Sequence, residues 1–160
     1  MAADSLDTPL RWLLDRARII DCIVRFANAF DRQDWNALRA CLADRIETDY
    51  SQFRGTPPGV ESADDYVAAR RNGLAGLRTL HLLSNHEVEI SGDLARCLSA
   101  YRIYRATDVD GRERCFDSAG QYAHELARDG SAAWRITRIR QTVVRRSGDP
   151  SIHRAFRPAP

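Results

Sequence analysis

Three turn dipeptides divide the second half of the chain and constrain its fold more than any other feature. Gly92-Asp93, Asp110-Gly111 and Asp129-Gly130 are pairs typical of two-residue β-hairpin loops. The segments between them run to roughly 13–18 residues, which is long for strands of a flat sheet. We therefore expect the chain from residue 79 onward to form a strongly bent, antiparallel meander.

The first half of the chain carries helix signals instead. Residues 9–31 place apolar side chains at steps of three and four, which predicts an amphipathic helix. Asp34 is a typical N-cap residue for a second, short helix. Ser62 and Asp65 resemble a capping box for a third helix. The expected order is helix 9–31, helix 34–42, strand 46–51, loop 55–59 and helix 62–78.

Helices followed by long antiparallel strands predict an α+β fold, with three N-terminal helices packed on the concave face of the bent sheet. A chain of 160 residues suits one domain, which buries about two-thirds of its unfolded surface and can enclose a pocket. We expect this domain to span residues 1–146. The glycines and prolines of residues 147–160 predict an irregular tail.

The charged residues exclude several classes of protein. All 24 Lys and Arg positions are arginine, so Schiff-base chemistry on lysine, pyridoxal phosphate attachment and a P-loop are excluded. The net charge of +2 argues against a nucleic-acid or membrane partner. Residues 135–157 hold seven arginines and one acidic residue, but no aromatic interleaving that would indicate nucleic-acid binding.

The cysteines and histidines show no metal-binding pattern. Cys22, Cys41, Cys97 and Cys115 form no Cys-x-x-Cys pair, and no two histidines have a zinc-site spacing. We interpret the four cysteines as buried thiols in a reducing compartment. No apolar run approaches the roughly 20 residues that span a bilayer, and the N-terminus lacks the pattern of a signal peptide. We therefore expect a cytoplasmic protein without a metal or other cofactor.

Four short phrases spread along the chain form a recognisable set. They are Ala29-Phe30-Asp31-Arg32-Gln33-Asp34-Trp35, Thr79-Leu80-His81-Leu82-Leu83-Ser84-Asn85, Gly120-Gln121-Tyr122 and Trp134-Arg135-Ile136. With the order of elements, they resemble the nuclear transport factor 2-like superfamily, in its SnoaL-like and scytalone-dehydratase-like branch. The resemblance covers residues 10–146. It implies a single SnoaL-like domain, a cone-shaped α+β barrel and assembly into a homodimer or homotrimer.

Within that branch, Asp31 and His81 match the catalytic dyad of scytalone dehydratase and of hexachlorocyclohexane dehydrochlorinase. In those enzymes the histidine removes a proton and the aspartate holds the histidine. Phe26 departs from the pattern, because bile-acid dehydratases of this fold carry a catalytic tyrosine there and the dehydrochlorinase a lysine. We expect Phe26 to contact the substrate instead.

Hairpin register gives an independent prediction. A two-residue loop at 92–93 places His81 opposite Tyr104, and one at 110–111 places Tyr104 opposite Asp117. This row would supply a base, a hydroxyl donor and a second carboxylate, although a single β-bulge reverses the assignment. The opposite face is more apolar and is an equal candidate for the pocket lining, with Tyr101 as the rival of Tyr104. It holds Cys97, Tyr101, Ile103, Phe116 and Tyr122.

Other side chains are candidates for substrate contacts. Tyr50, expected on the first strand, is a possible acid or oxyanion donor, or else an ordinary strand residue. Trp35 is either a ligand contact or an anchor of the second helix. Arg138 or Arg140 could bind a carboxylate or enolate oxygen, but the sequence does not say which of the two points inward.

The sequence therefore predicts a cofactor-independent lyase of the dehydratase type, or an isomerase. Its substrate would be a small, apolar, cyclic, oxygenated metabolite such as a polyketide or steroid. His81 would remove a proton next to a carbonyl while Asp31 orients it. Two alternatives stay open. A polyketide cyclase or ketosteroid-type isomerase would use Asp31 itself as the base, and a non-catalytic binding or subunit module would need neither residue.

Overall fold

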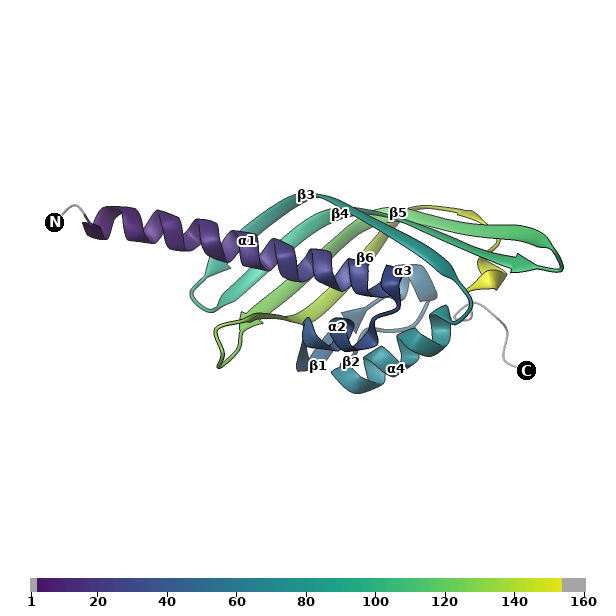
Figure 1. Ribbon diagram of the computed structural model, residues 1–160, viewed down its shortest axis with the longest axis horizontal. Coiled ribbons are helices and arrows are strands. Elements are labelled where there is room, and N and C mark those ends of the chain that lie inside the picture. The colour runs from purple at the N-terminus through teal and green to yellow at the C-terminus, as the bar shows by residue number, and fades with distance from the viewer. Residues whose placement is uncertain (1–2, 154–160) are drawn as a thin grey trace.

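The computed structural model describes residues 3–153 of the chain (Figure 1). Four helices and six strands follow one another, and a short 3-10 helix comes after the last strand. The helices are α1 (Ala3–Arg32), α2 (Trp35–Ala40), α3 (Ser51–Arg54) and α4 (Ala63–Leu74), and the 3-10 helix is η1 (Pro150–Ile152). The strands are β1 (Leu42–Asp49), β2 (Gly59–Ser62), β3 (Arg78–Ser91), β4 (Leu94–Val109), β5 (Arg112–Arg128) and β6 (Trp134–Gly148).

One curved sheet of six strands, in the order β2-β1-β6-β5-β4-β3, forms the body of the protein. Strands β3 to β6 make the expected antiparallel meander, which confirms the α+β class and the bent sheet. Strand β1 pairs antiparallel with β2 but parallel with β6. This parallel pair was not predicted, because hairpin signals report only on strands that are neighbours in the sequence.

Two of the three predicted two-residue hairpin loops are confirmed. Ser91 pairs with Leu94 around the first loop, and Val109 pairs with Arg112 around the second. The third prediction is wrong, since the loop between β5 and β6 runs over residues 129–133. There the Asp129 carboxylate accepts hydrogen bonds from the backbone N–H groups of Ser131 and Ala133, at 2.9 and 3.0 Å. An aspartate that closes a longer loop looks the same in the sequence as one in a two-residue turn.

The helix starts agree with the capping signals. The Asp34 side chain accepts a hydrogen bond from the Ala37 N–H at 2.9 Å, and Ser62 accepts one from the Asp65 N–H at 3.1 Å. The boundaries differ elsewhere. Helix α1 begins six residues before the predicted start at residue 9, and the first strand ends at Asp49, so Tyr50 lies just before α3.

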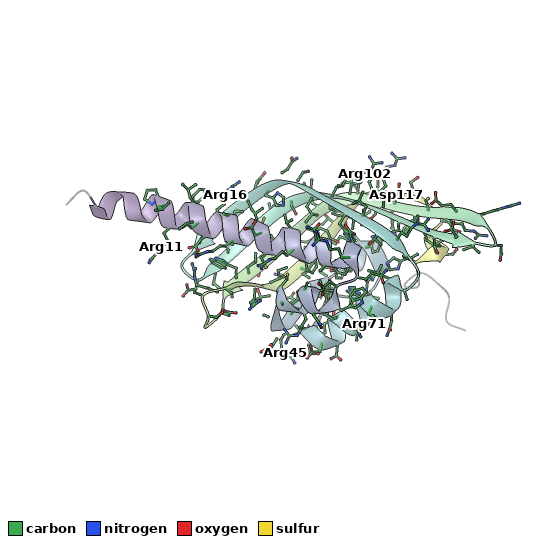
Figure 2. The ribbon with its side chains drawn as sticks, viewed as in Figure 1. Arg11, Arg16, Arg45, Arg71, Arg102 and Asp117 are labelled. Carbon is green, nitrogen blue, oxygen red and sulfur yellow. The ribbon has the colours of Figure 1, made fainter. Side chains whose placement is uncertain are left out.

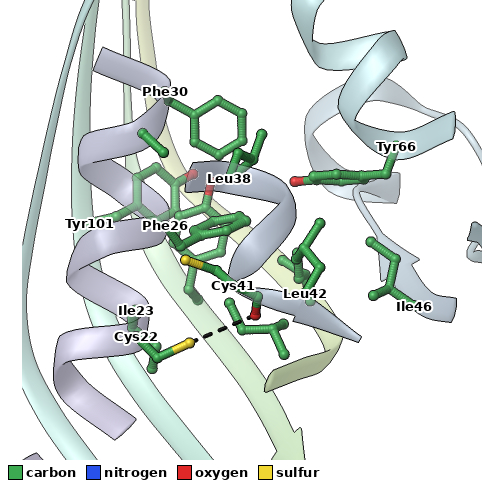
Figure 3. Packing of buried hydrophobic residues seen from close by; sticks show 14 of the residues in the cluster. Cys22, Ile23, Phe26, Phe30, Leu38, Cys41, Leu42, Ile46, Tyr66 and Tyr101 are labelled. Carbon is green, nitrogen blue, oxygen red and sulfur yellow. Dashed lines mark hydrogen bonds between the residues drawn. The ribbon is translucent and has the colours of Figure 1, made fainter. Parts of the chain in front are cut away.

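Helix α1 crosses the concave face of the sheet, and α2 and α4 lie beside its C-terminal end (Figure 1). The core fills the space between these helices and the sheet, as Figure 3 shows for the part around Phe26 and Tyr66. The Cys22 thiol donates to the backbone oxygen of Cys41 across this core, at 3.7 Å. Cys97 is also buried, but Cys115 is exposed, which corrects the prediction that all four thiols are buried. Among the described helices, none is long and apolar enough to cross a membrane.

A β-bulge in β3 decides which side chains face the core. The register of β3 against β4 shifts between Ser84 and Glu87, so His81 lies opposite Ile103 and not Tyr104. The β4–β5 register has no such shift, since Ala106 pairs with Cys115 and Ile103 with Ser118. His81 therefore shares the concave face with Ile103, the face that was the rival candidate for the pocket lining.

Candidate active site

A cavity of about 280 Å³ lies between the concave face of the sheet, the C-terminal end of α1 and helix α4. Its size is near the lower end of the range for small-molecule sites, roughly 300–1,000 Å³. Among the described residues that line it, none is acidic. The lining consists of Phe30, Tyr50, Phe53, Arg54, Tyr66, Ala69, Arg70, Asn72, Gly73, Leu74, His81, Ile103, Arg105, Tyr122, Gln141 and His153.

His81 and Asp31 are in contact at the wall of this cavity. The His81 Nδ1 atom lies 2.5 Å from Asp31 Oδ1, and the His81 backbone N–H donates to Asp31 Oδ2 at 2.7 Å. The Thr79 hydroxyl donates to Oδ1 at 2.9 Å. The two side chains are 9% and 15% exposed, and the ring of Phe30 stacks on the imidazole at 5.3 Å between ring centroids. Asp31 near the end of α1 and His81 near the start of β3 are therefore in direct contact, although 50 positions separate them in the sequence.

The surroundings of the pair set its charges. Burial lowers the pKa of His81 below its usual 6.5, against the influence of Asp31, and the positive charge of Arg105 lowers the pKa further. Burial acts to raise the pKa of Asp31, but the hydrogen bonds and charge of His81, together with Thr79, outweigh it and lower that pKa. At neutral pH Asp31 is therefore a carboxylate that accepts from Nδ1–H, and Nε2 of the neutral imidazole carries a lone pair.

Tyr50 lines the same cavity and is paired with a second phenol. Its hydroxyl lies 2.7 Å from the hydroxyl of Tyr66 on α4. Burial raises the pKa of Tyr50 well above its usual value, so its hydroxyl stays protonated. Because only one of the two hydroxyls donates in this contact, the other keeps its hydrogen for a third group. Within residues 3–153, no three His, Cys, Asp or Glu side chains gather as a metal site.

Tyr104 and Asp117 do not belong to the cavity. The bulge in β3 turns His81 to the concave face, and both residues alternate with the concave-face residues Ile103 and Ser118. The guanidinium of Arg102 lies over the Tyr104 ring at 4.7 Å on this outer face. Figure 2 shows Arg102 and Asp117 on the side of the sheet that faces away from α2 and α4. The predicted row of His81, Tyr104 and Asp117 is therefore wrong.

Four other candidate substrate contacts lie elsewhere. Arg138 forms ion pairs with Glu47 and Glu125, each at 3.2 Å, outside the cavity. Phe26 and Tyr101 are core residues (Figure 3). They pack against His124 and Tyr122 respectively, at ring distances of 5.6 and 4.7 Å. Trp35 is half-buried against the core, beneath the guanidinium of Arg71. None of these four is among the described residues that line the cavity.

The sequence reasoning missed three arginines of the cavity wall. Arg54 is the last residue of α3, four residues after Tyr50. Arg70 lies one helical turn after Tyr66 in α4, and Arg105 is on β4. A signal for Arg105 was present, because it continues the alternation of Tyr101 and Ile103 on the apolar face by one more step. No comparable signal pointed to Arg54 or Arg70.

Comparisons with known proteins agree on the architecture. The Kfla4162 protein from Kribbella flavida has a TM-score of 0.78 and 26% identity, over 84% of this chain and 93% of that one. The hexachlorocyclohexane dehydrochlorinase LinA-type3 from Novosphingobium barchaimii LL02 has a TM-score of 0.71 and 17% identity, over 94% and 99%. A proposed scytalone dehydratase from Novosphingobium aromaticivorans has 0.73 and 16%, over 86% and 89%. No curated protein sequence matches the chain.

At these sequence identities the structural similarities establish the fold alone. It is the cone-shaped α+β fold of the nuclear transport factor 2-like superfamily. The sequence comparison is more specific. The pattern of the SnoaL-like domain matches residues 11–140, from within α1 to the middle of β6. The chain therefore belongs to the SnoaL-like domain family.

Proposed function

We propose that this protein is a cofactor-independent lyase of the dehydratase type, or an isomerase, whose reaction begins with proton abstraction by His81. The observation that carries the proposal is the contact of 2.5 Å between His81 Nδ1 and Asp31 Oδ1 at the wall of an open cavity. A neutral imidazole held in one tautomer by a buried carboxylate is an effective general base. Relatives of this fold that are named as a dehydrochlorinase and a scytalone dehydratase support the same class.

The hydrogen bonds of Asp31 favour His81 over Asp31 as the base. Its two carboxylate oxygens accept from the His81 ring, the His81 backbone N–H and the Thr79 hydroxyl. A carboxylate with three donors is stabilised as an anion and is a weaker base. Asp31 then acts as a positioning residue, and His81 Nε2 removes the proton. The reading in which Asp31 itself is the base is less consistent with this geometry.

Protons and electrons balance along either reaction. Nε2 takes a proton from a carbon next to a carbonyl, the electron pair of the C–H bond forms a carbon–carbon double bond, and the π pair of the carbonyl moves to its oxygen. The free hydroxyl hydrogen of the Tyr50–Tyr66 pair is suited to stabilise that oxygen. In a dehydration, the electron pair then expels a hydroxyl from the next carbon, and the imidazolium protonates it to water. In an isomerisation, the imidazolium returns the proton to another carbon.

The cavity also argues against a purely structural module. Apolar side chains such as Phe30, Leu74 and Ile103 line it together with His81, and a space of about 280 Å³ remains between them. A small molecule with an apolar body fits this arrangement. Assembly into a homodimer or homotrimer remains part of the proposal, because the convex face of the sheet carries exposed apolar side chains such as Leu80 and Leu82.

The test uses a panel of small cyclic β-hydroxy ketones, with and without a carboxylate, incubated with the protein in D₂O. Mass spectrometry follows the uptake of deuterium next to the carbonyl and the loss of water. We expect His81→Asn to abolish both and Asp31→Asn to reduce them roughly 10²–10⁴-fold. The matched control is His86→Asn, since His86 lies on the same strand outside the cavity lining.

Two results would contradict the assignment. Full turnover by a folded His81→Asn variant would remove His81 as the base. A loss at Asp31→Asn that far exceeds the loss at His81→Asn would transfer the role of base to the carboxylate.

A further inference from the structure

Three arginines line the cavity without a counter-ion. Arg54, Arg70 and Arg105 form no ion pair within residues 3–153, whereas the eleven arginine–carboxylate contacts closer than 3.5 Å in that range all involve arginines outside the cavity. Arg70 and Arg105 are only 7% and 4% exposed. Buried charges in folded proteins are normally paired, because an unpaired one loses its hydration without compensation. Three together are therefore an arrangement that needs an explanation.

The hydrogen-bonding groups of these arginines are also underused. The Nε atoms of Arg54 and Arg70 are buried and have no partner among the described residues. Arg105 donates to the Ser118 hydroxyl at 3.1 Å and otherwise lies over the rings of Phe53 and Phe116. Arg70 also has a hydrogen bond to the Tyr66 hydroxyl, and the two Nε–H groups remain available to an acceptor from a ligand.

The three positive charges converge on one region. The guanidinium groups of Arg54 and Arg70 lie 4.9 and 4.8 Å from the centre of the same ring, that of Tyr50. His153 on the cavity wall experiences the positive charge of all three arginines, which adds to burial in lowering its pKa. A bound negative charge would relieve the mutual repulsion of these three groups.

This positive region lies next to the catalytic pair. Arg105 is the direct cross-strand partner of Thr79, whose hydroxyl holds Asp31. Along β4 it lies two residues beyond Ile103, the partner of His81, which is roughly 7 Å at the rise of a β-strand. A small molecule bound to Arg105 would therefore have another part of its structure within reach of His81.

We propose that the substrate carries a carboxylate, which binds between Arg54, Arg70 and Arg105 while its apolar body faces Phe30, Leu74 and Ile103. The flat fork of an arginine matches a carboxylate, and the rest of the cavity is too small for a large polar group. The assignment of this ligand as the substrate rests on the proposed function. The binding of an organic anion does not, and it can be measured separately.

Isothermal titration calorimetry with 2-naphthoate and its neutral counterpart 2-naphthamide tests the proposal. We expect naphthoate to bind more tightly, and Arg105→Gln to weaken its binding roughly 10- to 100-fold, as for the loss of a charge-assisted hydrogen bond. Arg54→Gln, at a half-buried position in α3, serves as a second variant should Arg105→Gln fail to fold. The matched control is Arg102→Gln, on the same strand but the outer face, and it should leave the affinity unchanged.

His81→Asn separates this proposal from the proposed function. We expect it to bind naphthoate as the unmodified chain does, even if it has lost all turnover. Equal affinity for naphthoate and naphthamide, or naphthoate binding that survives both Arg105→Gln and Arg54→Gln, would overturn the anion site. Inorganic phosphate that binds as tightly as naphthoate would show that the site holds a free inorganic ion, and the substrate proposal would fall.

Discussion

Acidification should destabilise this protein through a histidine that plays no part in the proposed chemistry. His124 on β5 is fully buried, between Phe26 at 5.6 Å and Tyr122 at 5.2 Å between ring centroids. Among the described residues, neither of its ring nitrogens has a hydrogen-bond partner. Burial lowers the pKa of His124 from 6.5 to about 3, and the charge of His86 contributes in the same direction.

The size of the effect follows from proton linkage. Above pH 6.5 neither the folded nor the unfolded state protonates this histidine, so the free energy of unfolding is at its full value. Between 6.5 and about 3 only the unfolded state takes up the proton, and each pH unit then costs about 1.4 kcal/mol of stability. Near pH 5 the loss is about 2 kcal/mol, a large part of the roughly 5–15 kcal/mol of a typical domain.

Urea unfolding at pH 7 and near pH 5 measures this loss. We expect the drop in the free energy of unfolding between the two pH values to be about 2 kcal/mol smaller in His124→Leu than in the unmodified chain. Tyr122→Phe is the control, because it alters a neighbour of His124 and removes no group that titrates in this range. An unchanged pH dependence in His124→Leu would refute the reasoning and mean that the folded state protonates His124 near its usual pKa.

Three further predictions concern the site, the sheet and assembly. Asp31→Asn should lower the pKa of His81 further, since the carboxylate opposes the effect of burial, and NMR titration of the imidazole would reveal an unchanged pKa if this is wrong. Gly120→Ala should cost more than about 2 kcal/mol in urea unfolding, because a Cβ there would lie within 2.0 Å of a backbone oxygen, whereas Gly130→Ala in an open loop should cost little. Light scattering should give at least twice the 18.1 kDa of one chain, and Leu82→Asp on the convex face should lower that mass, while a monomer before substitution would contradict self-association.

Local signals explain the part of the fold that the sequence predicts correctly. The caps at Asp34 and Ser62 and the turns at 92–93 and 110–111 each depend on a few neighbouring residues. The bulge near Asn85 depends on how a long strand bends around the core, and no local residue pattern marks it. One extra residue in β3 was enough to move His81 from the face of Tyr104 to the face of Ile103.

The contact of His81 with Asp31 was expected through the family resemblance, because the residues themselves are 50 positions apart and no spacing rule joins them. Gly120 shows how such a family phrase acquires a physical meaning. It stands opposite a β-bulge of β6, beside the backbone oxygen of Thr142 and the ring of Tyr101, where any side chain would collide. The glycine of this phrase is therefore required by the packing of the sheet and has no part in the proposed chemistry.

The sequence does not show which arginines have a carboxylate partner, and the arginines of the cavity are an example. Alternation along β4 places Arg105 on the same face as Ile103, but it cannot say whether a carboxylate lies within reach. Arg138 has two such partners and Arg105 has none among the described residues, although in the sequence both are simply arginines on strands. Burial lowers the pKa of Arg105 to about 10, which corresponds to roughly 3 kcal/mol against its charged form. The hydrogen bond to Ser118 and the rings of Phe53 and Phe116 offset part of that cost, and a carboxylate bound beside Arg105 would offset more of it.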